Sequence, residues 1–227
     1  MIKRLFKKLH ILHNIYIKHK YFLKKKSYSM EGEDEIIVDY FKNMESGFYV
    51  DAGCYHPTHL SNTHILFTKN WSGINIDLSE FSISLFNHVR PKDVNVNAAI
   101  SNSEKEITFY YQKNLSQLTT TVKEISRERM QGYIKEKKII ALSLNSIINN
   151  SKFKNKVIDF LNIDLEGAEL NALKSLDFNI YSPRLICVEI IEKDIMNSSV
   201  FKFLDNLKYR LIWSSKSKLN HIFEKIK

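Results

Sequence analysis

The chain has 227 residues, of which 44% are hydrophobic and 12% aromatic, so it is suited to a folded domain and unlike a disordered or collagen-like chain. No apolar run is long enough to span a bilayer as a helix, and no secretory signal follows the basic start. The two cysteines, Cys54 and Cys187, are far apart, which argues against a disulfide framework and favours a reducing, cytoplasmic environment.

The net charge of +9 is concentrated in residues 1–26, which hold nine basic residues and no acid, whereas residues 27–227 hold 25 of each sign. Apolar residues recur there at helical spacing, so we expect one basic amphipathic helix over 1–26, followed by a single domain over 27–227. Such a helix suits peripheral contact with an anionic membrane, or packing on its own domain or on a second subunit. The neutral domain argues against a nucleic-acid partner.

Strands and helices are expected to alternate after the basic segment. Ser29 is expected to cap a helix that contains Ile36, Ile37 and Phe41. Apolar runs predict strands over 48–50, 73–77, 94–100, 138–142, 157–164 and 184–191, helices over 62–69, 81–89, 168–176 and 200–207, and a closing hairpin of 209–213 with 221–223. Residues 112–135 are polar and show no clear period. The alternation predicts an α/β fold, with a mostly parallel sheet covered by helices on both faces.

Acidic residues lie at the ends of two of the expected strands. Parallel sheets bind their ligands beyond the carboxyl ends of the strands. Asp51 closes the first strand and is followed by Gly53, which lets the backbone come close to a ligand. Asp77 closes the second strand, where nucleotide-binding units place the acid that binds ribose hydroxyls. Because no G-x-G-x-x-G loop is present, the pattern favours an adenosine cofactor without phosphates, such as S-adenosylmethionine. The alternative is a turn acid and a surface acid without a ligand.

A second group of acids follows the strand over 157–164. Asp164 and Glu166 are two residues apart in an extended segment, so they point to the same side, and Gly167 permits a sharp turn. Glu189 lies near the end of the next strand. The three carboxylates are candidates to take a proton from a hydroxyl, to bind a divalent cation, or to hold the hydroxyls of a sugar. The alternative is that Glu166 only complements the dipole of the helix that follows.

Three histidines, His56, His59 and His64, surround the loop after the first strand. Their spacing fits no single metal geometry, and loop histidines more often form hydrogen bonds or face solvent. We therefore assign no metal ligand from the sequence.

Several strings, in this order along the chain, resemble the FkbM-type methyltransferases, which use S-adenosylmethionine. The most specific is the D-x-E-G-x-E string that begins at Asp164, within 160–170. The others lie at 29–34, 48–53, 56–57, 61–63, 73–77, 97–101 and 183–190. The chain departs from the family pattern at Met30, where Gln is usual, and at Ala168, where a common histidine would offer a base.

This resemblance implies a Rossmann-like class I methyltransferase fold with a seven-stranded sheet whose last strand is antiparallel. It also implies O-methylation, here of a hydroxyl on a sugar or surface-glycan intermediate in polysaccharide biosynthesis. The alternative is a non-catalytic or degenerate Rossmann-like module, docked to a membrane or a partner enzyme through the basic helix.

Site residues carried over by position divide into a cofactor set and a substrate set. The cofactor set consists of Asp51 and Gly53 beside the methionine part, Asp77 on the ribose, and Asn97 and Ala98 beside the adenine. The substrate set, facing the acceptor hydroxyl, consists of Asp164, Glu166 and Glu189.

Overall fold

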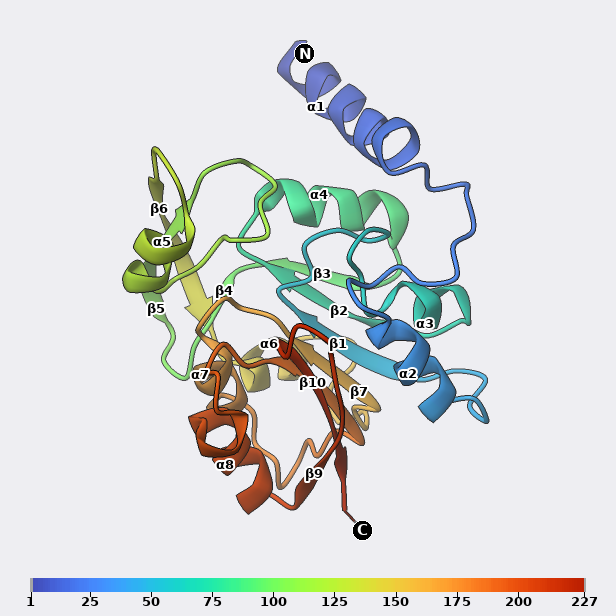
Figure 1. Ribbon diagram of the computed structural model, residues 1–227. Coiled ribbons are helices and arrows are strands. Elements are labelled where there is room, and N and C mark those ends of the chain that lie inside the picture. Colours follow the sequence, from blue (N-terminus) through green and yellow to red (C-terminus); the bar gives the residue numbers. More distant parts are fainter. Residues whose placement is uncertain (1, 227) are drawn as a thin grey trace.

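The computed structural model describes residues 2–226, and side chains from residue 4 onwards. Seven strands form one sheet in the order β3-β2-β1-β7-β8-β10-β9 (Figure 1). Their bounds are β1 Phe48–Ala52, β2 Ser72–Asp77, β3 Val94–Asn97, β7 Phe160–Ile163, β8 Leu185–Glu189, β9 Tyr209–Ser214 and β10 Asn220–Lys225. The first five strands of that order pair in parallel, and β10 is antiparallel to both of its neighbours. The predicted mostly parallel sheet and its antiparallel last strand are confirmed.

Successive residues of β1 face opposite sides of the sheet, so each side has its own apolar core. Phe48 and Val50 lie in the core that α6 (Leu144–Asn149), α7 (Glu169–Lys174) and α8 (Ser199–Asn206) cover. Tyr49 lies in the opposite core, which α2 (Glu33–Tyr40) and α3 (His64–Thr68) cover. Helices therefore cover both faces, as the sequence predicts.

A second, three-stranded sheet has the order β4-β6-β5 (Figure 1). Its strands are β4 Ala99–Ile100, β5 Lys105–Tyr111 and β6 Lys135–Leu142. The single strand predicted over 94–100 is therefore wrong, because β3 pairs with β2 whereas β4 pairs with β6. The unassigned segment between β5 and β6 contains helix α5 (Lys123–Arg129).

The N-terminal helix ends earlier than predicted. Helix α1 (Ile2–Leu12) continues into a π-helical turn, η1 (His13–Lys18), and Lys20 has a φ of 50°. Such a φ is incompatible with a right-handed helix, so the prediction of one helix over 1–26 is wrong beyond Lys18. The turn buries Ile15 completely against the following part of the fold, which shows that tertiary packing decides where the helix ends.

Helix α2 begins later than its predicted cap. The residue before it is Gly32, with a φ of 93°, and not Ser29. Ser29 still contributes to the helix start, because its Oγ accepts hydrogen bonds from the N–H groups of Gly32 (3.1 Å) and Asp34 (3.3 Å). The other predicted elements are confirmed with ends displaced by up to three residues, and α6 was not predicted. Among residues 2–226, no helix combines the length and apolarity needed to cross a bilayer.

Candidate active site

A cavity of about 250 Å³ lies where β1, β2, β7 and β8 end. Seven of the eight predicted site residues line it, namely Asp51, Gly53, Asp77, Ala98, Asp164, Glu166 and Glu189. Asn97 does not line the cavity, because its Nδ2 donates to the main-chain carbonyls of Asp77 and Leu78, both at 2.9 Å. Of the pair predicted beside the adenine, only Ala98 therefore reaches the cavity.

Gly53 lets the ends of three strands meet at the cavity. Its φ is +83°, and a Cβ atom added there would lie 1.7 Å from the carbonyl oxygen of Asp164. Its N–H donates to the carbonyl of Ile76 at 2.9 Å. A side chain would both strain the backbone and collide with the segment after β7, so the position requires glycine.

Asp51 is oriented by a buried polar network. Its two carboxylate oxygens accept hydrogen bonds from Thr63 Oγ1 (2.6 Å) and Asn162 Nδ2 (2.9 Å). Thr63 Oγ1 accepts in turn from Nη1 of the fully buried Arg90, at 2.9 Å. Burial raises the pKa of Asp51, and these hydrogen bonds and the Arg90 charge oppose the rise. None of the three partners was predicted from the sequence.

Asp77 already binds two main-chain groups. Its carboxylate accepts hydrogen bonds from the N–H groups of Tyr55 (2.8 Å) and Ser79 (2.7 Å), which ties the first loop to the start of α4 (Glu80–Val89). Burial raises the pKa of Asp77 to about 6 against the effect of these bonds. Each carboxylate oxygen has a second lone pair, so Asp77 can still accept a hydrogen bond from a ligand in the cavity.

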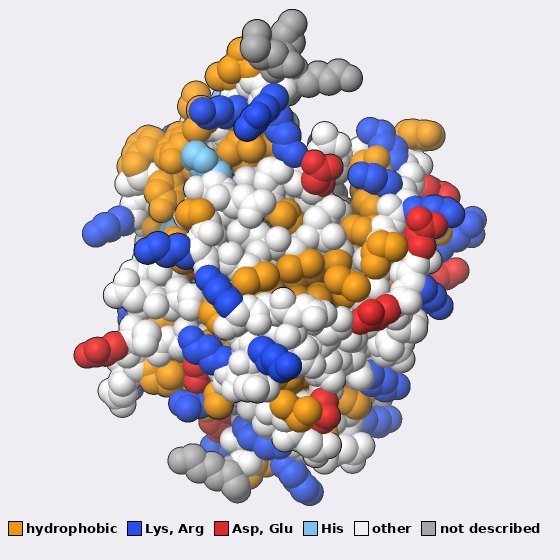
Figure 2. Space-filling model, turned by 180° about the vertical axis from the view of Figure 1, so that it is seen from behind, with side chains coloured by type: hydrophobic (Ala, Val, Ile, Leu, Met, Phe, Trp, Pro, Cys, Tyr) orange, Lys and Arg blue, Asp and Glu red, His pale blue; other side chains and the backbone are white. Residues whose placement is uncertain are grey.

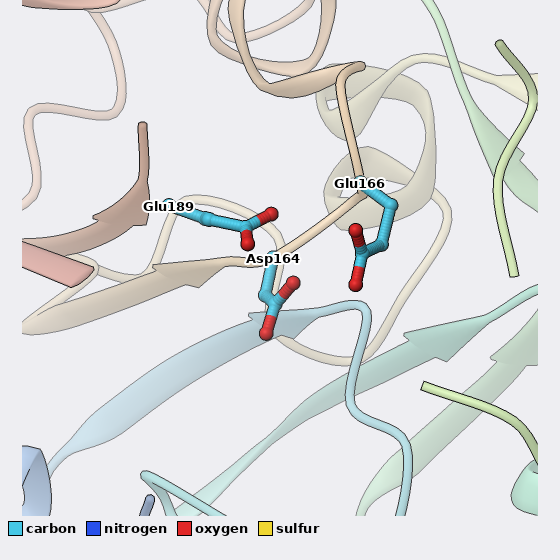
Figure 3. Close-up of side chains that lie close together, drawn as sticks. All are labelled: Asp164, Glu166 and Glu189. Carbon is cyan, nitrogen blue, oxygen red and sulfur yellow. The ribbon is translucent and has the colours of Figure 1, made fainter. Parts of the chain in front are cut away.

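The second group of acids converges as the sequence suggested. One carboxylate oxygen from each of Asp164, Glu166 and Glu189 lies within 4.8 Å of the other two (Figure 3). Glu166 has a φ of 53°, which is uncommon outside glycine and shows that its surroundings hold it in place. One such contact is the hydrogen bond from Thr120 Oγ1 to the Glu166 carbonyl, at 2.7 Å.

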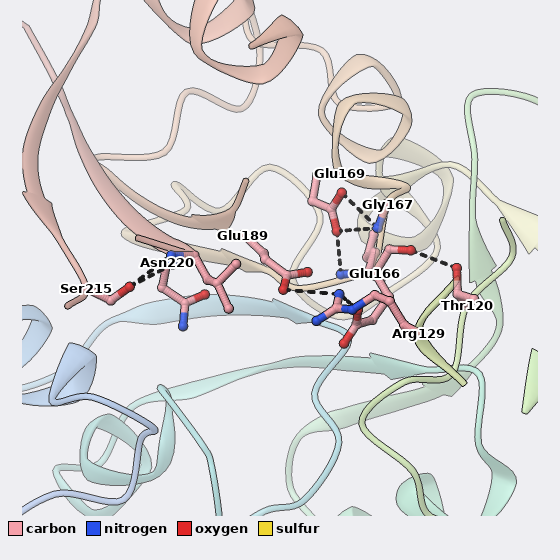
Figure 4. A network of polar contacts seen from close by, with 10 residues as sticks. Thr120, Arg129, Glu166, Gly167, Glu169, Glu189, Ser215 and Asn220 are labelled. Atoms are coloured by element: carbon pink, nitrogen blue, oxygen red, sulfur yellow. Dashed lines mark hydrogen bonds and ion pairs between the residues drawn. The ribbon is translucent and has the colours of Figure 1, made fainter. Parts of the chain in front are cut away.

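Arg129, at the end of α5, faces these acids (Figure 4). Its Nη1 contacts Glu166 Oε2 and lies 3.6 Å from Glu189 Oε1. The other oxygen, Glu189 Oε2, is buried and has no hydrogen-bond partner in the described part of the chain. Arg129 was not predicted from the sequence, because it lies in the polar segment that shows no clear period.

Burial raises the pKa of all three acids, and repulsion between carboxylates adds to the rise for two of them. Burial is the main cause for each, and the charge of Glu189 adds to the rise for Asp164 and Glu166. The pKa of Glu166 reaches about 8, whereas Arg129 limits the rise for both Glu166 and Glu189. The side chain of Asp164 is exposed and lines the cavity. The cavity walls still surround it, and its pKa lies well above the usual value. The group therefore holds exchangeable protons near neutral pH.

Glu169 fixes the turn that carries these acids (Figure 4). Its carboxylate accepts hydrogen bonds from the N–H groups of Leu165 (2.9 Å) and Gly167 (3.0 Å). Burial nevertheless raises its pKa to about 7. Glu169 thus positions the turn at the start of α7.

The histidines of the first loop do not meet as metal ligands. Within residues 2–226, Asp164, Glu166 and Glu189 are the one set of three or more His, Cys, Asp or Glu side chains close enough to share an ion. His56 Nε2 instead lies 2.9 Å from Asn14 Oδ1, and burial lowers the pKa of His56 to about 2.

Comparisons with known proteins identify relatives by sequence family and by fold. A family model for the methyltransferase FkbM domain matches residues 51–211. The search of curated proteins found no match. The methyltransferase FkbM of Methylobacillus flagellatus KT superposes with a TM-score of 0.53 at 12% identity, over 79% of this chain and 44% of that one. TehB of Haemophilus influenzae gives a TM-score of 0.42 at 12% identity, over 93% and 66%. The Methylobacillus protein thus shares the fold, and the chain spans less than half of its length.

Proposed function

The chain belongs to the FkbM methyltransferase family, and from this membership we propose that it transfers a methyl group from S-adenosylmethionine to a hydroxyl oxygen of a sugar or glycan intermediate. One observation carries the proposal. The strand-end acids Asp51 and Asp77 line the same cavity as the group formed by Asp164, Glu166 and Glu189. A single cavity thus offers groups suited to an adenosine cofactor and groups suited to a proton.

The residues around the cavity fit S-adenosylmethionine. Asp77 offers carboxylate acceptors for the two hydroxyls of a ribose, and the side chains of Leu78 and Ala98 form an apolar wall nearby. Asp51 offers a carboxylate in a fixed orientation for an ammonium group. When bound, the cofactor supplies a methyl group that is already activated by a positively charged sulfur. The tasks left to the protein are to orient the two reactants and to accept a proton.

The acceptor hydroxyl has to lose its proton as its oxygen forms the new bond. A base works best when its pKa lies near the working pH, and burial brings the pKa of Glu166 into that range. Arg129 favours the ionised forms of Glu166 and Glu189, and Glu189 Oε2 is an acceptor without a hydrogen-bond partner among the described residues. We propose that the hydroxyl proton passes to this group of acids, whose members titrate together.

A divalent cation among the same acids is the alternative. Three carboxylates are a usual ligand set for such an ion. Arg129, however, already places a positive charge between Glu166 and Glu189, so the residues present do not favour a cation there. Proton transfer to the carboxylates needs no metal, and we therefore expect the same turnover with and without EDTA.

The test is methyl transfer from methyl-labelled S-adenosylmethionine to a panel of sugar nucleotides and oligosaccharides, with the products identified by mass. Glu166→Gln keeps the side-chain shape and removes the charge, so turnover should fall by about 10²–10⁴-fold. Cofactor affinity should change much less. Glu136→Gln, at an exposed position of β6, is the matched control. Near-normal turnover in Glu166→Gln would show that Glu166 only supports the turn.

A further inference from the structure

The N-terminal helix α1 turns its apolar side to solvent. Leu5, Phe6 and Leu9 lie near one another on the helix surface and are 57%, 67% and 52% exposed. A helix on the surface of a domain ordinarily turns such a stripe towards the core. The exposed stripe is therefore without a partner in the described chain.

A neighbouring side of α1 contacts the body of the protein. Lys7 Nζ lies 2.7 Å from Glu80 Oε1, and the ring of His10 stacks on Phe81 with 4.4 Å between ring centroids. The following turn is anchored by the buried Ile15. These contacts hold the helix so that its apolar stripe faces outwards, where the helix projects from the fold (Figure 1).

Positive charge surrounds the stripe. Residues 1–26 carry nine basic side chains and no acidic one. Among the basic side chains of residues 4–26, only Lys7 and Lys26 form ion pairs within the described structure. Further exposed apolar side chains follow at Ile17, Phe22 and Leu23. Figure 2 shows hydrophobic and basic side chains side by side at the end of the molecule from which the helix projects.

We propose that residues 2–26 dock the protein on an anionic lipid bilayer, an interaction that goes beyond the proposed function. An apolar stripe flanked by lysine and arginine suits the boundary between lipid headgroups and acyl chains, with the basic groups near the phosphates. A second copy of the chain is a poorer occupant, because a two-fold symmetric contact would bring two acid-free basic segments together. Charge complementarity thus selects the lipid surface.

Docking through α1 places the bilayer next to a helix that borders the candidate active site. A groove of about 580 Å³ lies between α1 and α4, with Phe6, Lys7 and His10 on its helix side. The groove shares Leu78 and Thr119 with the catalytic cavity. Because Phe6 belongs to both the stripe and this groove, the docking helix borders the groove that adjoins the cavity.

Vesicle sedimentation of the full chain tests the proposal. At low salt we expect binding to vesicles of phosphatidylglycerol and phosphatidylcholine, no binding to phosphatidylcholine alone, and a steep loss of binding as salt is added. Arg4→Gln with Lys8→Gln should weaken binding about 25-fold, since each basic group near the surface contributes about five-fold. If the 227-residue chain does not bind the anionic vesicles at low salt, the proposal is overturned.

A second pair of variants tests the apolar stripe. Leu5→Ser with Leu9→Ser removes two exposed side chains, so the fold should be unaffected and vesicle binding should fall at least tenfold. Ile140→Ser with Met196→Ser is the matched control, because both side chains are similarly exposed far from α1 in the sequence. Unchanged binding in the leucine variant would contradict docking through the stripe. A dimer that the leucine variant disrupts, without vesicle binding, would assign the stripe to a second copy instead.

Discussion

Replacing Asp164 by Asn should stabilise the fold while it impairs catalysis. Asn keeps the shape of the side chain and removes one charge from the group that also contains Glu166 and Glu189. Two carboxylates 4.8 Å apart repel by about 3.5 kcal/mol at an effective dielectric constant of about 20 if both are ionised. Because protonation relieves part of this repulsion and solvent screens the exposed Asp164, we expect the free energy of unfolding to rise by only ~1–3 kcal/mol at about pH 8.5.

The gain depends on pH with a definite sign. Burial raises the folded-state pKa of Asp164 and Glu166 above their unfolded values, so the folded protein binds more protons between the two values. Stability therefore falls as pH rises. For Glu166, the destabilisation is absent below about pH 4, near the unfolded pKa, and develops fully above its folded pKa of about 8. The Asn variant should lose less stability over this range.

Urea unfolding at about pH 5 and about pH 8.5 measures the effect. The variant should gain more at the higher pH, and Asp205→Asn, at an exposed position of α8, should change little at either. A variant that is equally destabilised at both pH values would refute the reasoning. Asp164 would then support the turn after β7, and its charge would not lower the free energy of unfolding.

Two further predictions concern the cavity. Gly53→Ala should cost ~2–5 kcal/mol of unfolding free energy, since it adds a backbone clash to the strain of a positive φ. Gly132 has a similar φ of +85° with open space around an added Cβ, so Gly132→Ala should cost only ~1–2 kcal/mol. Equal costs for the two variants would show that the clash at Gly53 does not contribute. Arg129→Gln should raise the pKa of Glu166 and Glu189 and shift the pH profile of methyl transfer to higher pH. An unchanged profile would show that Arg129 does not influence the groups that accept the proton.

The parts of the site that follow local patterns were predictable from the sequence. Asp51 and Asp77 each end a short apolar run, and Asp164 and Glu166 follow another, so their positions at the edge of a parallel sheet follow from the period of the strands. Asn97, which was carried over from the family resemblance, does not reach the cavity, because the next strand leaves the main sheet and the asparagine side chain turns to the strand beside it.

The parts that depend on contacts between distant segments were not predictable. Arg90 reaches Thr63 across 27 residues of sequence, and Arg129 reaches Glu166 across 37, and no local period marks either arginine. The end of the N-terminal helix likewise depends on the burial of Ile15 against α4, a contact between segments that are distant in sequence.

Cofactor binding is the most direct test of the central claim that the cavity is a working methyltransferase site. Calorimetric titration with S-adenosylmethionine and with its demethylated product should show saturable binding of one molecule per chain. Asp77→Ala should weaken that binding by ~1–3 kcal/mol, because two ribose hydroxyls lose a charged acceptor. Circular dichroism of the variant checks the fold, since Asp77 also binds Tyr55 and Ser79. Absence of binding heat with either ligand, in folded wild-type protein, would contradict the account and favour a non-catalytic module.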